Sequence, residues 1–171
     1  MARKDKLIKL LKEYREGKIT DDEISKFITF FGEEQILNAR DIIEKFLISK
    51  NPINRYNALS TLVFEFRIRD HYKISIKFLL KDEDDLNRGL GASCLGSIYR
   101  GTKNKDILNL LMGVFEDKNE DWVVRDSAYA SILDVIGIPW KKQPPATKKL
   151  KKRDIDWNLI SSLKKINKTK K

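Results

Sequence analysis

Three stretches of this chain share one pattern, and they decide its fold. They read NPINRYNALSTL (51–62), DDLNRGLGASCL (84–95) and DWVVRDSAYASI (121–132). When Arg55, Arg88 and Arg125 are set in register, successive units lie 33 and 37 residues apart. Periods of about 20–50 residues are typical of arrays of stacked supersecondary units. The sequence therefore predicts a repeat protein.

Each shared position has a physical reason. Four residues before each Arg stands a residue suited to cap the start of a helix; these are Asn51, Asp84 and Asp121. Pro52 follows the first of them, at the helix position where proline is tolerated. A small residue three after the Arg lets a neighbouring helix approach, and an apolar residue stands seven after it. These pairs are Ala58 and Leu62, Gly91 and Leu95, and Ala128 and Ile132.

A second apolar segment precedes each cap, at residues 42–47, 74–80 and 107–115. Each unit is thus expected to be a helix, a short turn and a capped helix. Because such a hairpin cannot bury its apolar face alone, neighbouring hairpins must stack.

At these positions the sequence resembles the HEAT-repeat family, in the variety named after phycobilisome lyases. That family shows an acidic or turn residue, an Arg near the start of the second helix, a small residue three later and an apolar residue seven later. The resemblance covers about residues 34–138. It implies an α-solenoid in which the three repeat Arg side chains are structural and bond to caps or carbonyls of adjacent units. The alternative is that they line a ligand groove. Asn54 and Asn87 depart from the family, which usually has an apolar residue just before the Arg.

Helical periodicity continues on the N-terminal side of the repeats. Apolar residues on one face predict a first helix that ends at Gly17. Thr20 and Glu23 form a capping box for a second helix. We expect Gly32 to end that helix and a third helix to cover residues 33–49.

Residues 63–69 alternate in the manner of a strand, and we interpret them as the end of a helix because the pattern before them is helical. The predicted fold class is all-α. It is an α-solenoid of about three HEAT-like hairpins in a domain of residues 1–140, with an N-terminal helical cap and a C-terminal capping helix. The repeats are expected at about residues 34–69, 70–103 and 104–138.

The net positive charge of the chain is confined to its C-terminal segment. Residues 141–171 hold 12 of the 35 basic residues and 2 of the 25 acidic ones, so they carry the whole net charge of +10. Residues 1–140 sum to zero. The segment starts as a basic linker in which Pro144-Pro145 favours an extended chain. It continues as an amphipathic helix with Asp156 as its N-cap and Trp157 on its apolar face.

Three roles for residues 141–171 compete. In the favoured one the helix docks on the last repeat with Trp157 as its anchor, because terminal repeats need caps. In the second the linker binds RNA or DNA backbone without sequence preference. Its candidate polyanion contacts are Lys141, Lys142, Lys148, Lys149, Lys151, Lys152 and Arg153. The lack of aromatic residues within the linker argues against base stacking. In the third the helix lies on an anionic membrane or in a partner's groove.

The sequence offers no residue set for catalysis, a metal or a cofactor. His71 is the single histidine and is expected to be inert at the surface of a turn. Cys94 is the single cysteine and is expected to be buried and inert. We therefore expect a protein that is not an enzyme and holds no cofactor. The one enzymatic alternative is an analogy to HEAT-like DNA glycosylases for alkylated bases, with Trp122, Arg125 and Asp126 on a concave surface.

A non-catalytic protein–protein interaction module is the function that the sequence favours. Trp122, Asp126 and Tyr129 are its candidate partner surface. In size and layout the chain resembles small HEAT-like immunity proteins that inhibit a partner toxin. A nucleic-acid-associated protein that acts through its basic tail is the alternative. We expect no signal peptide, because residues 1–12 are charged throughout, and no membrane span, because no apolar run of 18 residues exists. A cytoplasmic monomer is the corresponding expectation.

Overall fold

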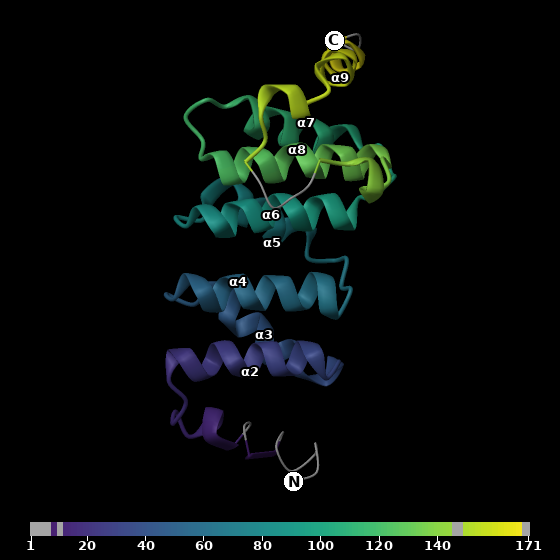
Figure 1. Ribbon diagram of the computed structural model, residues 1–171. Helices are drawn as coiled ribbons and strands as arrows, with labels where there is room; N and C mark the ends of the chain where they lie inside the picture. Colours follow the sequence, from purple (N-terminus) through teal and green to yellow (C-terminus); the bar gives the residue numbers. More distant parts are fainter. Residues whose placement is uncertain (1–7, 10–11, 145–148, 169–171) are drawn as a thin grey trace. The chain divides into compact units, whose positions relative to one another are not determined.

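The computed structural model describes residues 8–9, 12–144 and 149–168, apart from the side chains of residues 152 and 165–168. Over these ranges the chain is helical and forms no strand, which confirms the all-α class. The chain divides into two compact units, Met1–Ile68 and Arg69–Lys171, and Figure 1 labels the helices of both. The division lies one residue before the boundary expected between the first and second repeats, and the repeat bounds stay predictions. The number of repeats and their stacking into one solenoid stay predictions.

The first unit is built on α2 (Asp21–Glu33) and α4 (Pro52–Ser60), which pack against each other. The capping box predicted at the start of α2 is confirmed. The Glu23 N–H donates to Thr20 Oγ1 at 3.4 Å, and the Thr20 N–H donates to the Glu23 carboxylate at 2.8 Å. The buried face of α2 carries Phe27, Ile28 and Phe31. These side chains form part of the apolar core of the first unit.

Helix α2 ends later than predicted, because it passes Gly32 and stops in a Schellman-type turn. The Ile36 N–H donates to the Phe31 carbonyl at 3.0 Å. The Gln35 N–H donates to the Gly32 carbonyl, also at 3.0 Å. Gln35 adopts the left-handed backbone conformation that this turn needs, with φ of 52°. Gly32 serves packing instead, since a Cβ at Gly32 would lie 3.1 Å from the side chain of Thr61.

The prediction of one continuous helix over residues 33–49 is wrong. The left-handed residue at position 35 interrupts the helix, and three short pieces follow it. These are η1 (Leu37–Ala39), α3 (Arg40–Glu44) and η2 (Lys45–Ile48). The first and last are 3₁₀ turns, which commonly flank a short α-helix. The first helix of this hairpin is therefore irregular.

The alternating stretch near residue 63 is helical as far as Glu65. The element η3 (Thr61–Glu65) continues α4 as a π-helical turn, closed by a hydrogen bond from the Phe66 N–H to the Thr61 carbonyl at 2.9 Å. The chain leaves the helix at Arg67, where φ is 55°. The interpretation as the end of a helix is confirmed for residues 63–65, and residues 66–69 lie beyond the helix.

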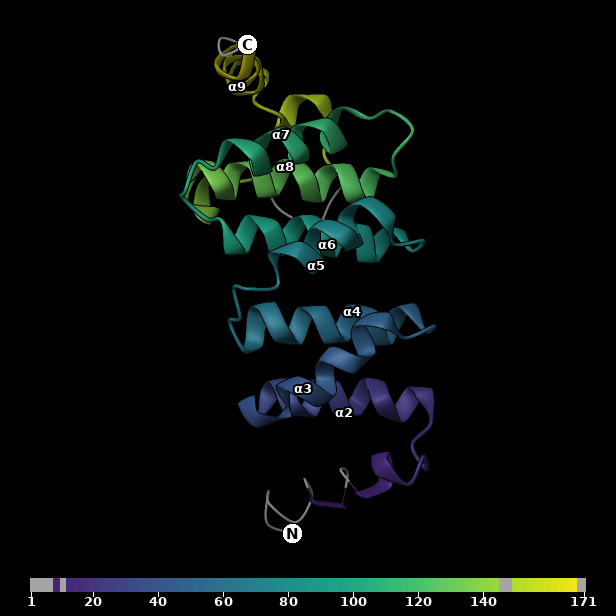
Figure 2. The same ribbon diagram turned by 180° about the vertical axis from the view of Figure 1, so that it is seen from behind.

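The second unit contains two helical hairpins. Helix α5 (Tyr72–Lys81) packs on α6 (Asp85–Ile98), and α7 (Lys105–Glu116) packs on α8 (Trp122–Ile136). Helix α6 also packs against α8, so the two hairpins share one apolar core (Figure 2).

Two glycines allow the helices of the second unit to approach closely. A Cβ on Gly91 would lie 2.5 Å from the backbone nitrogen of Leu79 in α5. A Cβ on Gly96 would lie 2.9 Å from the Cβ of Ser131 in α8. The role predicted for the small residue three after the repeat Arg is confirmed at Gly91.

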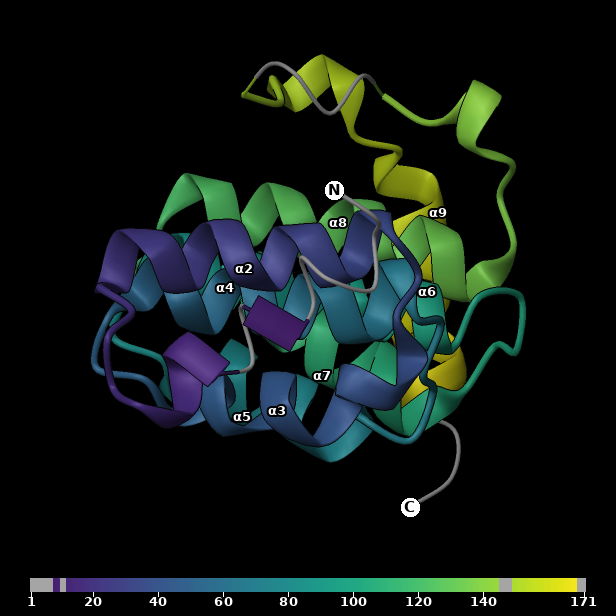
Figure 3. The same ribbon diagram turned by 90° about the horizontal axis from the view of Figure 1, so that it is seen from below.

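Three further elements follow α8 within the second unit. They are η4 (Trp140–Lys142), η5 (Lys152–Asp154) and α9 (Trp157–Lys168). We name residues 149–156 the strap. Figure 3 shows η4 and the strap on the side of α8 that faces away from α7. The chain therefore turns back along α8 before α9 begins.

Candidate functional site

The repeat Arg side chains hold the turns inside the hairpins. Arg55 Nη1 donates to the carbonyls of Ser49 and Lys50, at 2.9 and 3.1 Å. Arg88 Nη1 makes the same two bonds to the carbonyls at the equivalent positions, at 3.0 and 3.1 Å. Carbonyls at the end of a helix lack donors within that helix. The guanidinium groups satisfy them and so fix the path of each turn.

Two of the repeat Arg residues make further contacts within the second unit. Arg125 Nε donates to the Phe115 carbonyl at the end of α7, at 3.0 Å. Arg88 also forms a two-pronged ion pair with Glu120, with Nη2–Oε1 at 2.8 Å and Nε–Oε2 at 3.2 Å. The hydrogen bonds to Glu120 raise the pKa of Arg88 further above neutrality. The carbonyl bonds thus lie within the hairpin of each Arg, and Arg88 reaches the next hairpin through Glu120.

The predicted capping residues stand at the starts of the second helix of each hairpin. Each accepts a hydrogen bond from a backbone N–H of the first turn: Asn51 from Ile53 (2.9 Å), Asp84 from Asn87 (3.0 Å) and Asp121 from Val123 (2.7 Å). Such caps satisfy donors that would otherwise have no partner at the helix start.

Two backbone hydrogen bonds fasten the strap to α8. The Leu150 N–H donates to Asp126 Oδ2 at 2.8 Å, and the Asp156 N–H donates to the hydroxyl oxygen of Tyr129 at 2.8 Å. Asp126 and Tyr129 are three residues apart and therefore lie on one face of α8. The side chains of Leu150 and Ile155 pack on the apolar core beneath.

Of the partner surface predicted from the sequence, Asp126 and Tyr129 lie under the strap, and Trp122 stays 43% exposed beside it. The Lys149 ammonium sits 5.3 Å from the centroid of the Trp122 ring. The Asp126 carboxylate is occupied by the Leu150 N–H, and Tyr129 is buried. The structure brings the three residues together on one face of α8, and their role as a partner surface stays a prediction. Tyr129 itself is buried while the strap is in place.

Burial beneath the strap raises the pKa of both titratable groups on this face of α8. For Asp126 the main cause is loss of water around the carboxylate, opposed by the hydrogen bond from Leu150 and by the nearby cations Arg125 and Lys149. For Tyr129 desolvation is again the largest cause, and the hydrogen bond from Asp156 opposes it. The ionised form of Asp126 is therefore less stable relative to its protonated form here than it is in water.

Helix α9 packs on the second unit through Ile160. This side chain is 1% exposed and belongs to the apolar core, with Leu159 and Leu163 packed beside it. Trp157, the anchor expected from the sequence, is 43% exposed, and its ring centroid lies 6.0 Å from that of Phe115. Ile160 is thus the anchor, because it is buried in the core while Trp157 keeps almost half of its surface exposed.

Two polar contacts fix the course of α9. Asp156 caps its start as predicted, since Asp156 Oδ1 accepts the Leu159 N–H at 2.9 Å. Lys164 forms an ion pair with Glu116 of α7. Neither Glu116 nor Ile160 could be singled out from the sequence, because both partners of each contact lie far apart in the chain.

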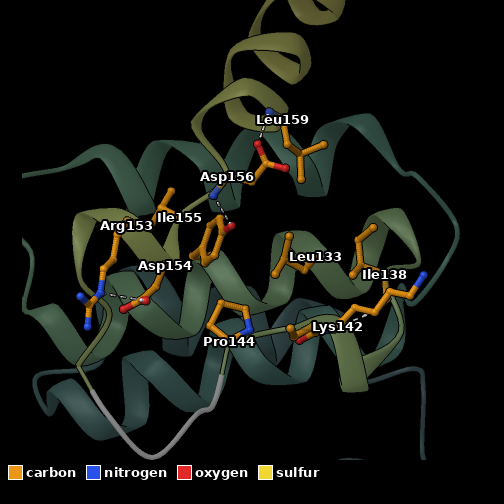
Figure 4. A pocket seen from close by; sticks show the side chains of 11 residues that line it. Leu133, Ile138, Lys142, Pro144, Arg153, Asp154, Ile155, Asp156 and Leu159 are labelled. Atoms are coloured by element: carbon orange, nitrogen blue, oxygen red, sulfur yellow. Dashed lines mark hydrogen bonds and ion pairs between the residues drawn. The ribbon is translucent and has the colours of Figure 1, made fainter.

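A cavity of about 580 Å³ lies between the strap and the end of α8 (Figure 4). Leu133, Ile138 and Leu159 supply its apolar lining. Its charged lining is mixed, with Lys142, Arg153, Asp154 and Asp156. Arg153 and Lys142 lie at opposite ends of it (Figure 4). Because cations and carboxylates share this lining, the cavity selects no single charge class of ligand.

The basic side chains predicted to contact a polyanion remain at the surface after the strap has docked. The exposed ones are Lys141, Lys142, Lys149, Lys151 and Arg153. Lys148 and the side chain of Lys152 lie outside the described residues. Arg153 Nε is 3.9 Å from the Asp154 carboxylate, which also accepts the Lys151 N–H at 2.8 Å.

The residues considered for chemistry occupy structural positions. His71 was expected at the surface, yet it is buried at the start of α5 with Nδ1 2.9 Å from the Asp70 carboxylate. Cys94 is buried as predicted, and desolvation raises the pKa of its thiol. In the parts of the chain that the structure describes, no three His, Cys, Asp or Glu side chains are grouped to hold a metal.

Comparison of the chain with protein-family models, with curated proteins and with solved structures finds no match. The HEAT-like assignment therefore rests on the repeat residues themselves. Within the described ranges, no helix is both long enough and apolar enough to cross a membrane.

Proposed function

We propose that this protein is a non-catalytic protein-binding module of HEAT-like hairpins stacked as an α-solenoid. The observation that carries the proposal is a pair of exposed apolar side chains at the turn of two successive hairpins. They are Ile48 and Ile53 in the first unit and Leu80 and Leu86 in the second.

These exposed side chains recur at related places in the repeat. Ile53 and Leu86 each stand two residues before the repeat Arg, and Ile48 and Leu80 stand near the end of the helix that precedes the turn. A single exposed apolar residue is ordinary. Recurrence at a turn that an Arg side chain holds in place is a stronger sign of recognition, because a preorganised surface loses less conformational entropy when it binds.

The packing of α9 supports the stacked arrangement in this proposal. A hairpin at the end of an array exposes an apolar face that needs a cap. Burial of Ile160 on the core shared by α7 and α8 fits that role. An immunity-type inhibitor of a partner protein is one form of the proposal.

Substitution of the turn residues tests the function. The variants are Ile48→Asp with Ile53→Asp, and Leu80→Asp with Leu86→Asp. Leu37→Asp is the matched control, because Leu37 and Ile53 are almost equally exposed (58% and 59%) and Leu37 lies in η1, away from the turn that follows η2. Partners captured from nuclease-treated native extract would be identified, and the affinity of the purified partner would be measured by calorimetry.

We expect the turn variants to lose about tenfold or more in affinity, since each buried apolar side chain contributes about 1.5–3 kcal/mol. The control should bind as wild type, and all variants should retain wild-type stability. Recovery of nucleic acid alone, or equal binding by the turn variants, would contradict the proposal.

A further inference from the structure

Two exposed tryptophan rings lie beside the basic side chains of the C-terminal segment. Trp140 is 70% exposed, with the Lys141 ammonium 5.6 Å from its ring centroid. Trp122 lies at the start of α8, and the docked strap brings Lys149 over its ring. The linker sequence has no aromatic residue of its own, so the fold supplies the rings that the linear pattern lacks.

The lysines around these rings are available to an anion. Lys141, Lys142, Lys149 and Lys151 form no ion pair with any residue that the structure describes. Two nearby carboxylates accept backbone hydrogen bonds: Asp126 of α8 from the Leu150 N–H, and Asp154, within the strap itself, from the Lys151 N–H. The Asp126 carboxylate is thus used to hold the strap, and the four lysine side chains stay exposed to solvent.

We propose that Trp122, Trp140 and the basic side chains Lys141, Lys142, Lys149, Lys151 and Arg153 form a binding surface for single-stranded nucleic acid. The cations contact phosphates, and unpaired bases stack on the two tryptophans. Cationic grooves combined with aromatic platforms are the general means of binding single strands without sequence preference. Helix α8 spans roughly 21 Å between the regions of the two rings, which suits a strand of several nucleotides.

The geometry favours a single strand over the other polyanions. Stacking needs unpaired bases, which a duplex does not offer. Binding to a membrane surface would use the apolar face of an amphipathic helix. In α9 that face is already occupied, because Ile160 is buried and Leu159 and Leu163 pack on the core.

Fluorescence anisotropy with the full-length protein tests the proposal. The probes are labelled oligo-dT and oligo-rU of about 12 nucleotides, in a salt series that starts at about 50 mM. We expect both probes to bind and to quench tryptophan fluorescence. Five phosphate contacts predict a slope near −3.5 for the logarithm of affinity against the logarithm of salt concentration.

Two variants separate stacking from charge. Trp140→Ala should lower affinity about fivefold or more, the range of one base–aromatic stack, and should leave thermal stability unchanged because the ring is exposed. The second variant changes four lysines to Gln together: Lys141, Lys142, Lys149 and Lys151. It should show no binding at the highest salt concentration of the series at which the wild type still binds. The matched control changes four exposed lysines of α5 and α7 to Gln: Lys73, Lys77, Lys81 and Lys105.

The proposal is overturned if neither oligonucleotide binds, or if the α5 and α7 control loses as much affinity as the C-terminal variant. It is also overturned if a duplex, heparin or phosphatidylserine vesicles bind at least as tightly and Trp140→Ala has no effect, since the surface would then respond to charge alone. The site is separate from the hairpin turns, so Leu80→Asp with Leu86→Asp should leave oligonucleotide affinity intact.

Discussion

The carboxylate of Asp126 accepts a hydrogen bond from the backbone N–H of Leu150 at 2.8 Å, and this bond ties α8 to a strap 24 residues further along the chain. This contact shows that part of the segment carrying the net charge of +10 is packed on the rest of the protein. Within the segment that carries the net charge, the strap packs on α8 through its backbone N–H groups and through Leu150 and Ile155, while the side chains of Lys149, Lys151 and Arg153 stay exposed.

The charge of Asp126 predicts a pH dependence of stability. Burial raises the pKa of Asp126 above its ordinary value of 3.8, so the folded protein binds this proton more tightly than the unfolded chain does. The contribution of Asp126 to the free energy of unfolding should therefore fall as pH rises through the folded pKa. Asp126→Asn keeps an oxygen for the Leu150 N–H and lacks this titration. Its stability relative to wild type should increase as the pH rises from the ordinary pKa of 3.8 through the raised pKa of folded Asp126.

Urea unfolding at a series of pH values measures this difference. Asp126→Ala, which removes the acceptor, should be less stable than Asp126→Asn by about 1 kcal/mol at every pH. A difference between wild type and Asp126→Asn that does not vary with pH would show that the carboxylate is not desolvated by the strap.

Removal of the Ile160 side chain should lower the free energy of unfolding more than removal of the Trp157 ring, because Ile160 is more deeply buried. Ile160→Ala removes buried methylene groups and leaves a cavity, and we expect a loss of about 2–4 kcal/mol in the free energy of unfolding. Trp157→Ala removes a partly exposed ring and should cost about 1 kcal/mol. Denaturant unfolding measures both, with the exposed Ser161→Ala as control. A larger loss for Trp157→Ala would restore the tryptophan as the anchor of α9.

Two glycine substitutions should change the stability of the protein in opposite directions. Gly91→Ala places a Cβ 2.5 Å from the Leu79 nitrogen, so α5 and α6 must separate, at a cost of about 1–3 kcal/mol. A Cβ on Gly113, in the last turn of α7, would meet no atom within 4 Å, so Gly113→Ala should stabilise the protein by about 0.5–1 kcal/mol. Thermal unfolding gives the sign of each change. Stabilisation by Gly91→Ala would mean that the two helices do not approach so closely.

The ion pair between Arg88 and Glu120 should couple the two hairpins of the second unit. Its side chains are only 20% and 19% exposed, so solvent screens the pair weakly. A double-mutant cycle with Arg88→Met and Glu120→Gln should give a coupling energy of about 1 kcal/mol or more. The pair of Arg100 with Asp134, where the Arg side chain is 53% exposed, should give less than about 0.5 kcal/mol. Equal coupling in the two pairs would argue against a specific bridge.

The local features of the fold were predictable from the sequence. The capping box at Thr20, the cap residues before each repeat Arg and the small residue at position 91 act over a few residues or through a repeated pattern. The interruption of the predicted helix at residue 35 was not predictable from the sequence. It depends on Gln35, which adopts a left-handed backbone conformation although it is not a glycine.

The site was less predictable, because its contacts are long range. Sequence reasoning grouped Trp122, Asp126 and Tyr129 correctly on one face of α8, since the spacing of a helix is known in advance. It could not show that the strap covers this face, because a hydrogen bond from Asp156 to Tyr129 joins residues 27 apart. The lack of aromatic residues in the linker argued against base stacking, while the fold places Trp122, which lies outside the linker, beside Lys149.

Amide hydrogen exchange in the native protein, followed by NMR, tests most directly whether the strap is docked on α8. The structure predicts that the Leu150 and Asp156 amides exchange about tenfold or more slowly than in the unfolded chain. Protection of Leu150 should be lost in Asp126→Ala and kept in Ser161→Ala. Exchange of the wild-type Leu150 amide at the rate of an unfolded chain would contradict the docked strap.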